Sequence, residues 1–349
     1  MEGYRWTRIS NWSLRPGTGR FWGLLNPDVC RLIDEDKFDS VVIYTGYAYA
    51  TFWFALAAAK WKRVPIIFGT DAHDLAPTLA PLSTKRWKTW VKKRLWPWLF
   101  GLADVVIVPS SGSSGLMRSL GIPDDRVVLT PYCVDNDWWS EESAKVDRRL
   151  IRSRWHIPSD APVALFCGKF QPWKRPHDLL QAFARAGVPE AYLVYAGEGP
   201  LRAEVERQVH ALGIDGRVRF LGFVNQSGLP AVYRASDVFV LPSDYEAFGV
   251  VVNEAMLCGC PVIASDRVGA RFDLIRAGES GFIYPSRDVN GLAQILRLTL
   301  RDPVLRARIS EAARKQMAGW SPDQNVDGTV RAIERAVQLR SRAETEWRS

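Results

Sequence analysis

The chain has 349 residues, 47% of them hydrophobic, and a formal net charge of +8 at pH 7. This length allows two domains of ordinary size, and this hydrophobic fraction excludes a disordered chain. The positive charge favours acidic partners such as nucleotides, phospholipids or nucleic acid, but it is spread along the chain and selects none of them. Five cysteines without a paired CxxC pattern indicate reduced thiols and a cytoplasmic protein.

Strand and helix alternation begins only at Asp39, because the preceding residues are aromatic and basic and lack a strand followed by a glycine-rich loop. The nearly uncharged stretch 41–59 is about long enough to cross a membrane, but Gly46 and Pro65 fit a β-α-β unit better. We therefore expect an N-terminal Rossmann-like domain over residues 1–135. Strands are expected at 41–44, 65–68, 104–108 and 126–129, and helices at 50–60 and 113–120.

The segment 85–98 combines the highest concentration of positive charge with several tryptophans. On a helix, an apolar face would separate from most of the lysines, and that face would hold Trp87, Trp90, Val91, Leu95 and Trp98. This pattern is typical of a helix on an anionic membrane surface, and equally of a surface helix packed on its domain; both interpretations stay open. No recognition motif accompanies the charge, so nucleic acid is not expected as a partner.

In the second half of the chain, predicted strands and helices alternate more regularly. Residues 136–160 are charged and aperiodic and form the expected connector, and residues 161–320 form a second Rossmann-like domain. Residues 321–349 are expected to form a helical tail that packs back on the N-terminal domain. Because strands alternating with helices build parallel sheets covered on both faces, the predicted class is α/β, with two domains facing a cleft near the strand carboxyl ends.

The most specific pattern lies in segment 243–254. Two carboxylates, Glu246 and Glu254, stand eight residues apart. Between them, Phe248-Gly249 opens a predicted helix that follows a strand. The start of a helix presents free N–H groups to phosphate, and ionised carboxylates accept hydrogen bonds from sugar hydroxyls. Phosphate together with two polyol contacts suggests a nucleotide-sugar site.

Two lysines follow the predicted strand 163–167. Lys169 and Lys174 stand five residues apart on one loop, so both can reach a diphosphate and neutralise a departing nucleotide. The segment Gly197-Glu198-Gly199 is not a full dinucleotide-binding fingerprint. The segment 135–137 resembles a metal-binding DxD motif, but it lies in the connector, and we expect no metal site.

Together and in this order, the motifs resemble the retaining GT-B glycosyltransferases of family four. The resemblance covers the second domain well and the first loosely, through 121–123 and 131–135. It rests on Gly168-Lys169 with Lys174, on 196–201, on 218–224, on Glu246-Ala247-Phe248-Gly249 with Glu254, and on 259–264.

The resemblance implies a GT-B fold and a metal-independent hexosyltransferase without a cofactor. Its donor would be a nucleotide-diphosphate sugar, and its acceptor a saccharide or a lipid-linked sugar. The implied pathway is polysaccharide or glycolipid biosynthesis, in the cytoplasm or peripherally at the inner membrane face. Two alternatives remain open, a nucleotide-sugar epimerase of similar fold and a non-catalytic nucleotide-sugar-binding protein.

The resemblance also implies roles for individual residues. Lys174 would contact the diphosphate, Glu246 the donor sugar and Glu254 the ribose hydroxyls. Lys169 stands where the family has arginine, so it keeps the charge but loses the bidentate fork. His73 is the best match for a histidine near the donor sugar, with Asp71 as the alternative. Backbone groups near the sugar, the phosphates and the base would come from Phe248, Gly249, Val250 and Val224.

Two departures from the family pattern stand out. Family members begin with a strand and a glycine-rich loop, whereas residues 1–40 show neither, so the chain looks as if it begins after that unit. In the loop 268–273, Ala270 replaces a glycine and Asp273 takes the acidic position. We therefore expect the donor-side loop to sit differently.

Overall fold

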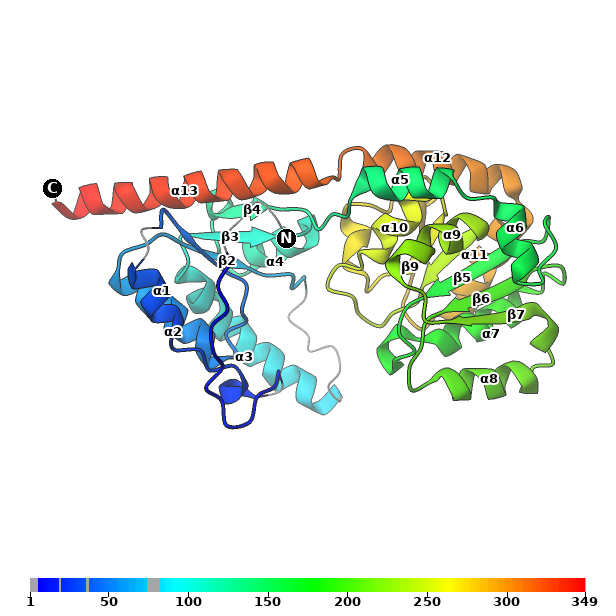
Figure 1. Ribbon diagram of the computed structural model, residues 1–349, viewed down its shortest axis with the longest axis horizontal. Coiled ribbons are helices and arrows are strands. Elements are labelled where there is room, and N and C mark those ends of the chain that lie inside the picture. Colours follow the sequence, from blue (N-terminus) through cyan, green and yellow to red (C-terminus); the bar gives the residue numbers. More distant parts are fainter. Residues whose placement is uncertain (1–5, 19, 36–37, 74–81, 349) are drawn as a thin grey trace.

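The computed structural model describes residues 6–18, 20–35, 38–73 and 82–348, and of residues 35, 82–88 and 343–348 the backbone alone. They form two α/β domains arranged along the longest axis of the molecule, and the C-terminal helix reaches from the second domain back over the first (Figure 1). Each domain contains one sheet of parallel strands. The predicted α/β class is confirmed.

The N-terminal sheet has the strand order β1-β2-β3-β4, so neighbours in the sheet are also neighbours in sequence. Its strands are β1 (Val41–Ile43), β2 (Ile66–Gly69), β3 (Val105–Val108) and β4 (Val127–Leu129). The helices of this domain are α1 (Val29–Glu35), α2 (Ala50–Trp61), α3 (Leu82–Gly101) and α4 (Ser111–Ser119).

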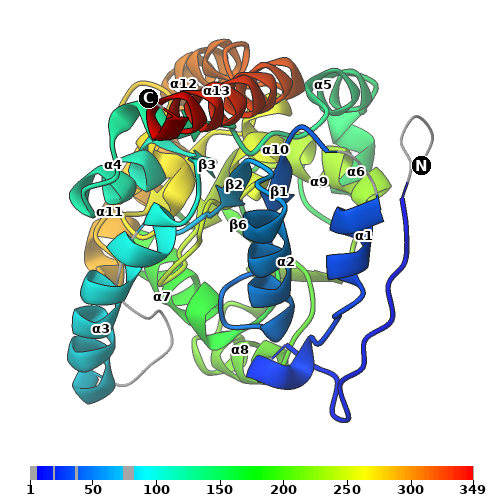
Figure 2. The ribbon, with the colours of Figure 1, turned by 90° about the vertical axis from the view of Figure 1, so that its left-hand side faces the viewer.

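Both faces of the N-terminal sheet are covered, by different parts of the chain. Val106 and Val108 of β3 face a core shared with α2, α3 and α4, whereas Val105 and Ile107 face α13 (Pro322–Arg348). This split follows from the two-residue period of a strand. Figures 1 and 2 both show α13 on one side of this sheet and α2 and α3 on the other.

The C-terminal sheet has the order β10-β9-β8-β5-β6-β7, which is that of a doubly wound nucleotide-binding fold. The order reverses between β5 and β8, so their carboxyl ends mark the expected ligand position. The strands are β5 (Val163–Cys167), β6 (Tyr192–Ala196), β7 (Val218–Gly222), β8 (Val238–Leu241), β9 (Val262–Ser265) and β10 (Gly281–Tyr284). The helices are α7 (Pro176–Ala186), α8 (Arg202–Ala211), α9 (Leu229–Ala235), α10 (Val251–Leu257), α11 (Val289–Arg301) and α12 (Pro303–Met317).

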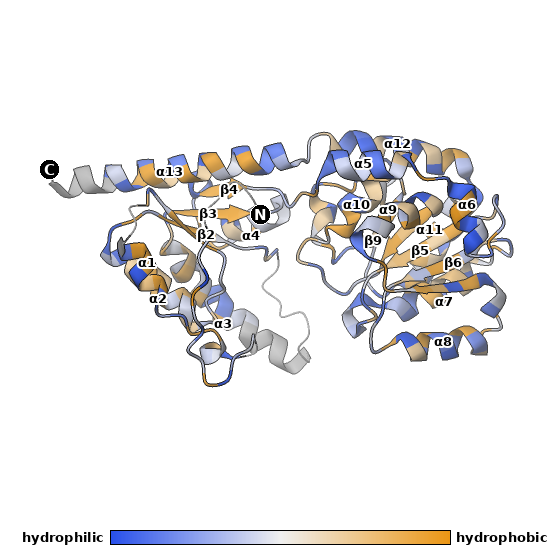
Figure 3. Ribbon diagram, viewed as in Figure 1, coloured by the Kyte–Doolittle hydropathy of each residue, from blue (hydrophilic) through white to orange (hydrophobic). Residues whose placement is uncertain are grey.

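The strands of both sheets are mostly hydrophobic, whereas the helices carry many hydrophilic residues (Figure 3). Within β5, Val163 and Leu165 belong to one core cluster, and Ala164 and Phe166 to the cluster on the opposite face. All five residues of β5 are buried. A central strand that is buried on both faces has this near-continuous apolar sequence.

The connector is helical rather than extended. It contains α5 (Asn136–Ala144) and α6 (Arg148–Arg154), which pack on α9. Each helix begins at an aspartate cap: the Asp135 carboxylate accepts from the N–H of Trp138, and Asp147 caps α6 in the same way. The helices are nine and seven residues long, too short for a clear period in the sequence.

Before β1, the described residues form a short 3-10 helix, η1 (Phe21–Gly23), and α1, but no strand. The expectation that this region lacks a strand is therefore confirmed for the ranges 6–18, 20–35 and 38–40. Along its outer edge, β1 has no partner strand among the described residues. Within the same described part of the chain, no helix combines the length and the apolar character needed to cross a membrane.

Helix α3 buries a different side from the one that the sequence pattern singled out. Trp96, Leu99 and Phe100 lie in the domain core. Trp90 is 61% exposed and Trp98 is 55% exposed. The expected apolar face therefore points away from the core at these two positions, and the Trp87 side chain lies outside the described part.

Candidate functional site

The loop that leaves β8 carries Glu246 on a fixed backbone. The Glu246 N–H donates to the carbonyl of Arg267 at 3.0 Å, and its carbonyl accepts from the N–H of Gly269 at 3.0 Å. Glu246 and Val268 form a parallel bridge, so the loops after β8 and β9 are joined beyond the ends of their strands. The position of the Glu246 side chain is thereby determined by two neighbouring strands.

The Glu246 carboxylate forms an ion pair with Lys174. Lys174 Nζ lies 2.5 Å from Glu246 Oε1, and Ser243 Oγ donates to the same oxygen at 2.7 Å. The Lys174 side chain is 19% exposed and that of Glu246 15% exposed. The sequence assigned these residues to the diphosphate and the sugar separately, whereas the structure brings them together. An ammonium has three donors, so Lys174 can keep this pair and still bind a phosphate oxygen.

Glu254 lies on the first turn of α10 and accepts a hydrogen bond from the Tyr233 hydroxyl at 2.9 Å. Burial raises the pKa of Glu254 to about 7, and the bond from Tyr233 opposes this rise. Burial also raises the pKa of the neighbouring Cys167 thiol to about 11. Glu254 therefore changes its charge near neutral pH.

The segment between the two glutamates has structural as well as potential binding roles. The Phe248 ring is buried, with an edge contact to Tyr132 at 5.7 Å and a stacked contact to Trp320 at 6.0 Å between centroids. Gly249 has a φ of +95°, which L side chains rarely adopt. Helix α10 begins at Val251, and Val250 is 39% exposed. The side chain of Phe248 thus anchors the loop, and the carbonyls of Gly249 and Val250 accept from the N–H groups of Val252 and Glu254 at 2.9 and 3.2 Å.

Among the described residues, the side chains of Lys169 and Val224 form no hydrogen bond or ion pair with Lys174, Glu246 or Glu254. Lys169 is exposed and follows β5; its carbonyl accepts from the N–H of Gln171 at 2.8 Å, and its ammonium forms no hydrogen bond or ion pair with another described residue. Val224 is half-buried and lies two residues beyond β7. Both leave the carboxyl edge of the same sheet as Glu246, the edge at which doubly wound folds bind ligands.

His73 reaches this loop from the N-terminal domain. Its Nε2 lies 2.9 Å from the carbonyl oxygen of Glu246, and its ring stacks on Tyr245 with centroids 5.1 Å apart. A carbonyl only accepts, so Nε2 carries the proton, and Nδ1 of the neutral ring is left as an acceptor. The alternative residue, Asp71, is exposed; burial, with a smaller contribution from Asp71, raises the pKa of Tyr132 to about 12.

A second contact between the domains uses the loop that departs from the family pattern. The N–H of Ser111, at the start of α4, donates to the Asp273 carboxylate at 3.0 and 3.3 Å. Burial raises the pKa of Asp273, and the bonds from Ser111 oppose this rise. The acidic side chain of the donor-side loop is therefore engaged by the N-terminal domain.

Sequence reasoning missed several residues that shape the site. Ser243 is a small polar residue just after a strand end, and this position was the one signal that could have indicated it. Tyr233 lies on α9, 21 residues before Glu254, and no local pattern connects the two. Arg271 stacks on Phe272 at 3.9 Å, and its buried Nε has no partner among the described residues.

Comparisons with known proteins identify relatives of both domains. The protein-family model described as Glycosyl transferases group 1 matches residues 147–316, and the one described as Glycosyl transferase 4-like domain matches residues 3–133. A D-inositol 3-phosphate glycosyltransferase of Geodermatophilus obscurus is 35% identical over 234 residues, which are 64% of this chain and 50% of that protein. The sulfoquinovosyl transferase SQD2 of Arabidopsis thaliana is 28% identical over 294 residues, 82% of this chain and 55% of that protein.

Among solved structures, the Anabaena HepE protein in complex with UDP superposes with a TM-score of 0.69 at 22% identity. The match covers 86% of this chain and 80% of that chain. This likeness concerns the fold, and the predicted GT-B architecture is confirmed. The chain spans about half the length of the curated relatives it matches.

Proposed function

Because the chain belongs to the glycosyl transferases group 1 family, we propose that it transfers a sugar from a nucleotide-diphosphate sugar to an acceptor hydroxyl. The observation that carries this proposal is the Lys174–Glu246 ion pair, next to the switch point of a doubly wound sheet. Cationic and anionic side chains that meet there can hold a diphosphate and the sugar attached to it.

The proposed mechanism assigns one task to each side chain. Lys174 and Lys169 stabilise the negative charge that develops on the departing diphosphate, without a metal or another cofactor. Glu246 accepts hydrogen bonds from the donor sugar, Glu254 accepts from the ribose, and His73 holds the loop of Glu246 beside the sugar. The two glutamates act as acceptors rather than as nucleophile and acid, so retention of configuration does not require a glycosidase-like pair.

The donor and the acceptor follow from the chemistry of the site and from the relatives. The structure of HepE contains UDP, which supports a uridine diphosphate donor as the first candidate. A lipopolysaccharide core biosynthesis glycosyltransferase of Rhizobium meliloti, 33% identical over 220 residues, supports a saccharide or lipid-linked acceptor in glycan synthesis. We also propose that the exposed face of α3 contacts an anionic membrane surface at the cytoplasmic side.

Release of nucleotide from a panel of UDP-sugars and GDP-sugars, with saccharide and lipid-linked acceptors, tests this function. We expect turnover with at least one donor. The change Lys174→Ala lowers kcat about 100-fold or more, the scale for losing one donor to the transition state. The control Lys315→Ala removes an exposed lysine of α12 that pairs with Glu311, and it leaves kcat unchanged.

Other results would contradict the proposal in distinct ways. Equal turnover by the wild type and Lys174→Ala would remove the assignment of the site. Donor binding without turnover would identify a non-catalytic nucleotide-sugar-binding protein. Conversion of the donor into an isomer without an acceptor would identify an epimerase.

A further inference from the structure

A cavity of about 340 Å³ lies on the C-terminal domain, where β8 begins. Its walls come from α6, α9, α12 and the turn after α10. The described residues that line it include no aromatic ring, and the charged ones are Arg148, Arg234, Asp237, Arg306 and Arg314. Four arginines therefore face a single carboxylate.

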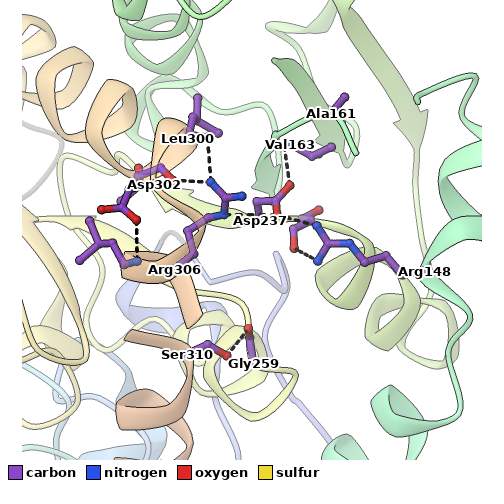
Figure 4. A network of polar contacts seen from close by, with 12 residues as sticks. Arg148, Ala161, Val163, Asp237, Gly259, Leu300, Asp302, Arg306 and Ser310 are labelled. Carbon is purple, nitrogen blue, oxygen red and sulfur yellow. Dashed lines mark hydrogen bonds and ion pairs between the residues drawn. The ribbon is translucent and has the colours of Figure 1, made fainter. Parts of the chain in front are cut away.

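Asp237 is the centre of a polar network at this cavity. Its carboxylate lies 2.5 Å from Arg148 Nη2, 2.6 Å from Arg152 Nη2 and 3.4 Å from Arg306 Nε. Figure 4 shows Arg148 and Arg306 approaching Asp237 from different sides. Arg148 and Arg306 also donate to carbonyls at the C-terminal ends of α9 and α11, whose partial negative charge offsets part of the cationic excess.

The two remaining arginines have no such partners. No hydrogen bond or ion pair joins the guanidinium of Arg234 or Arg314 to another described residue, although both line the cavity. Arg314 lies directly over Gly259, where an added Cβ would come within 1.9 Å of its Nη2 and where φ is +70°. A glycine at this turn thus leaves the room that the guanidinium occupies.

The positive charges of Arg234 and Arg314 also act on the side chain that precedes this turn. Burial raises the pKa of the Cys258 thiol to about 12, and Arg234 and Arg314 both act against this rise. Cys258 immediately precedes Gly259, against which Arg314 lies, and both arginines line the cavity together with this glycine. The Asp237 carboxylate is already engaged by Arg148, Arg152 and Arg306, and the nearby Glu311 pairs with Lys315. A bound anion would therefore relieve the remaining repulsion between Arg234 and Arg314.

We propose that this cavity binds a small phosphate-bearing anion, such as orthophosphate or pyrophosphate. Guanidinium groups recognise phosphate oxygens in paired hydrogen bonds, and Arg234 and Arg314 have their donors available. The Ser310 hydroxyl lines the same cavity and donates to the Gly259 carbonyl at 2.7 Å, so it fixes the turn on which Arg314 rests. The lack of an aromatic lining favours an anion without a nucleobase.

This site is separate from the proposed donor site and does not depend on it. Asp237 immediately precedes β8, whereas Glu246 follows the opposite end of that strand. The four residues of β8 keep the two sites roughly 13 Å apart or more. The anion would join Arg234 of α9 to Arg314 of α12, which leads into α13, so it would hold α12 on the C-terminal domain.

Calorimetric titration of the full chain with pyrophosphate tests the proposal. The double variant Arg234→Gln/Arg314→Gln should lose at least tenfold in affinity at this site, because it removes both available donors. Lys169→Ala/Lys174→Ala removes the proposed donor-site cations and should retain the binding. The control Arg149→Gln/Arg207→Gln removes the same charge from exposed positions that do not line the cavity, and it should bind as the wild type does.

Thermal unfolding separates lost binding from lost folding. Without anion, the arginine double variant should melt at or above the wild-type temperature, since repulsion between cations is relieved, and pyrophosphate should raise only the wild-type value at this site. Undiminished pyrophosphate binding in the arginine double variant would overturn the proposal. So would the absence of any binding in the lysine double variant. If UDP binds this site as tightly as pyrophosphate does, the inference that the bound anion lacks a nucleobase is wrong.

Discussion

At the scale of single residues, Glu254 makes the stability of the folded protein depend on pH. Its pKa of about 7 lies above the ordinary value of 4.5, so the folded protein favours the neutral carboxyl. This contribution to stability is complete below about pH 4.5 and is lost as pH rises through 7. We predict that Glu254→Gln flattens the fall in unfolding free energy between these pH values, which for the wild type is on the order of 2 kcal/mol. Denaturant unfolding at pH 5 and pH 7.5 measures it, and parallel pH profiles would contradict it.

The same scale shows what a single sequence can and cannot predict about a site. Glu246, Glu254 and Lys174 could be named because each stands at a fixed offset from a strand end, where parallel sheets bind ligands. Tyr233 could not, because its hydroxyl meets Glu254 through the packing of α9 on α10, which leaves no local pattern. The direct Lys174–Glu246 pair was missed for the same reason.

At the scale of elements, α3 presents tryptophans and cations on an exposed surface. Arg94 lies 5.6 Å from the ring of Trp90, and Trp98 stacks on Trp53 at 6.2 Å. We predict that Trp90→Ala/Trp98→Ala weakens binding to anionic liposomes roughly 30-fold, since each of the two buried rings contributes on the order of 1 kcal/mol. Co-sedimentation measures this, with Trp61→Ala on α2, 85% exposed, as the control. If all three proteins bind liposomes alike, α3 does not contact the membrane.

Helices and strands with a clear hydrophobic pattern were predictable from the sequence, and those that depend on tertiary contacts were not. The buried strands β3 and β5 were evident as apolar runs, because both of their faces are covered. The short helices α5 and α6 were missed, because aspartate caps and packing on α9 stabilise them rather than amphipathic periodicity. The sequence left open whether the tryptophan face of α3 packs on the core, since the pattern does not show which of two apolar faces is buried.

At the scale of the whole molecule, the two domains touch through the loops that carry the candidate site. His73 contacts the backbone of Glu246, and Ser111 contacts Asp273. The N-terminal domain therefore contacts both the loop after β8 and the loop after β9. Helix α13 adds a third connection, with Ala332 and Ala336 buried against β2 and β3. A ligand held by Lys174 and Glu246 would therefore lie close to side chains of both domains.

The most direct test of this account is a crystal structure of the protein with an intact or non-hydrolysable UDP-sugar. We predict the diphosphate within hydrogen-bond distance of Lys174 Nζ, the sugar hydroxyls on Glu246 and the ribose hydroxyls on Glu254. A nucleotide bound at another surface, with both glutamates still in their present contacts to Lys174 and Tyr233 and no ligand beside them, would contradict the central claim.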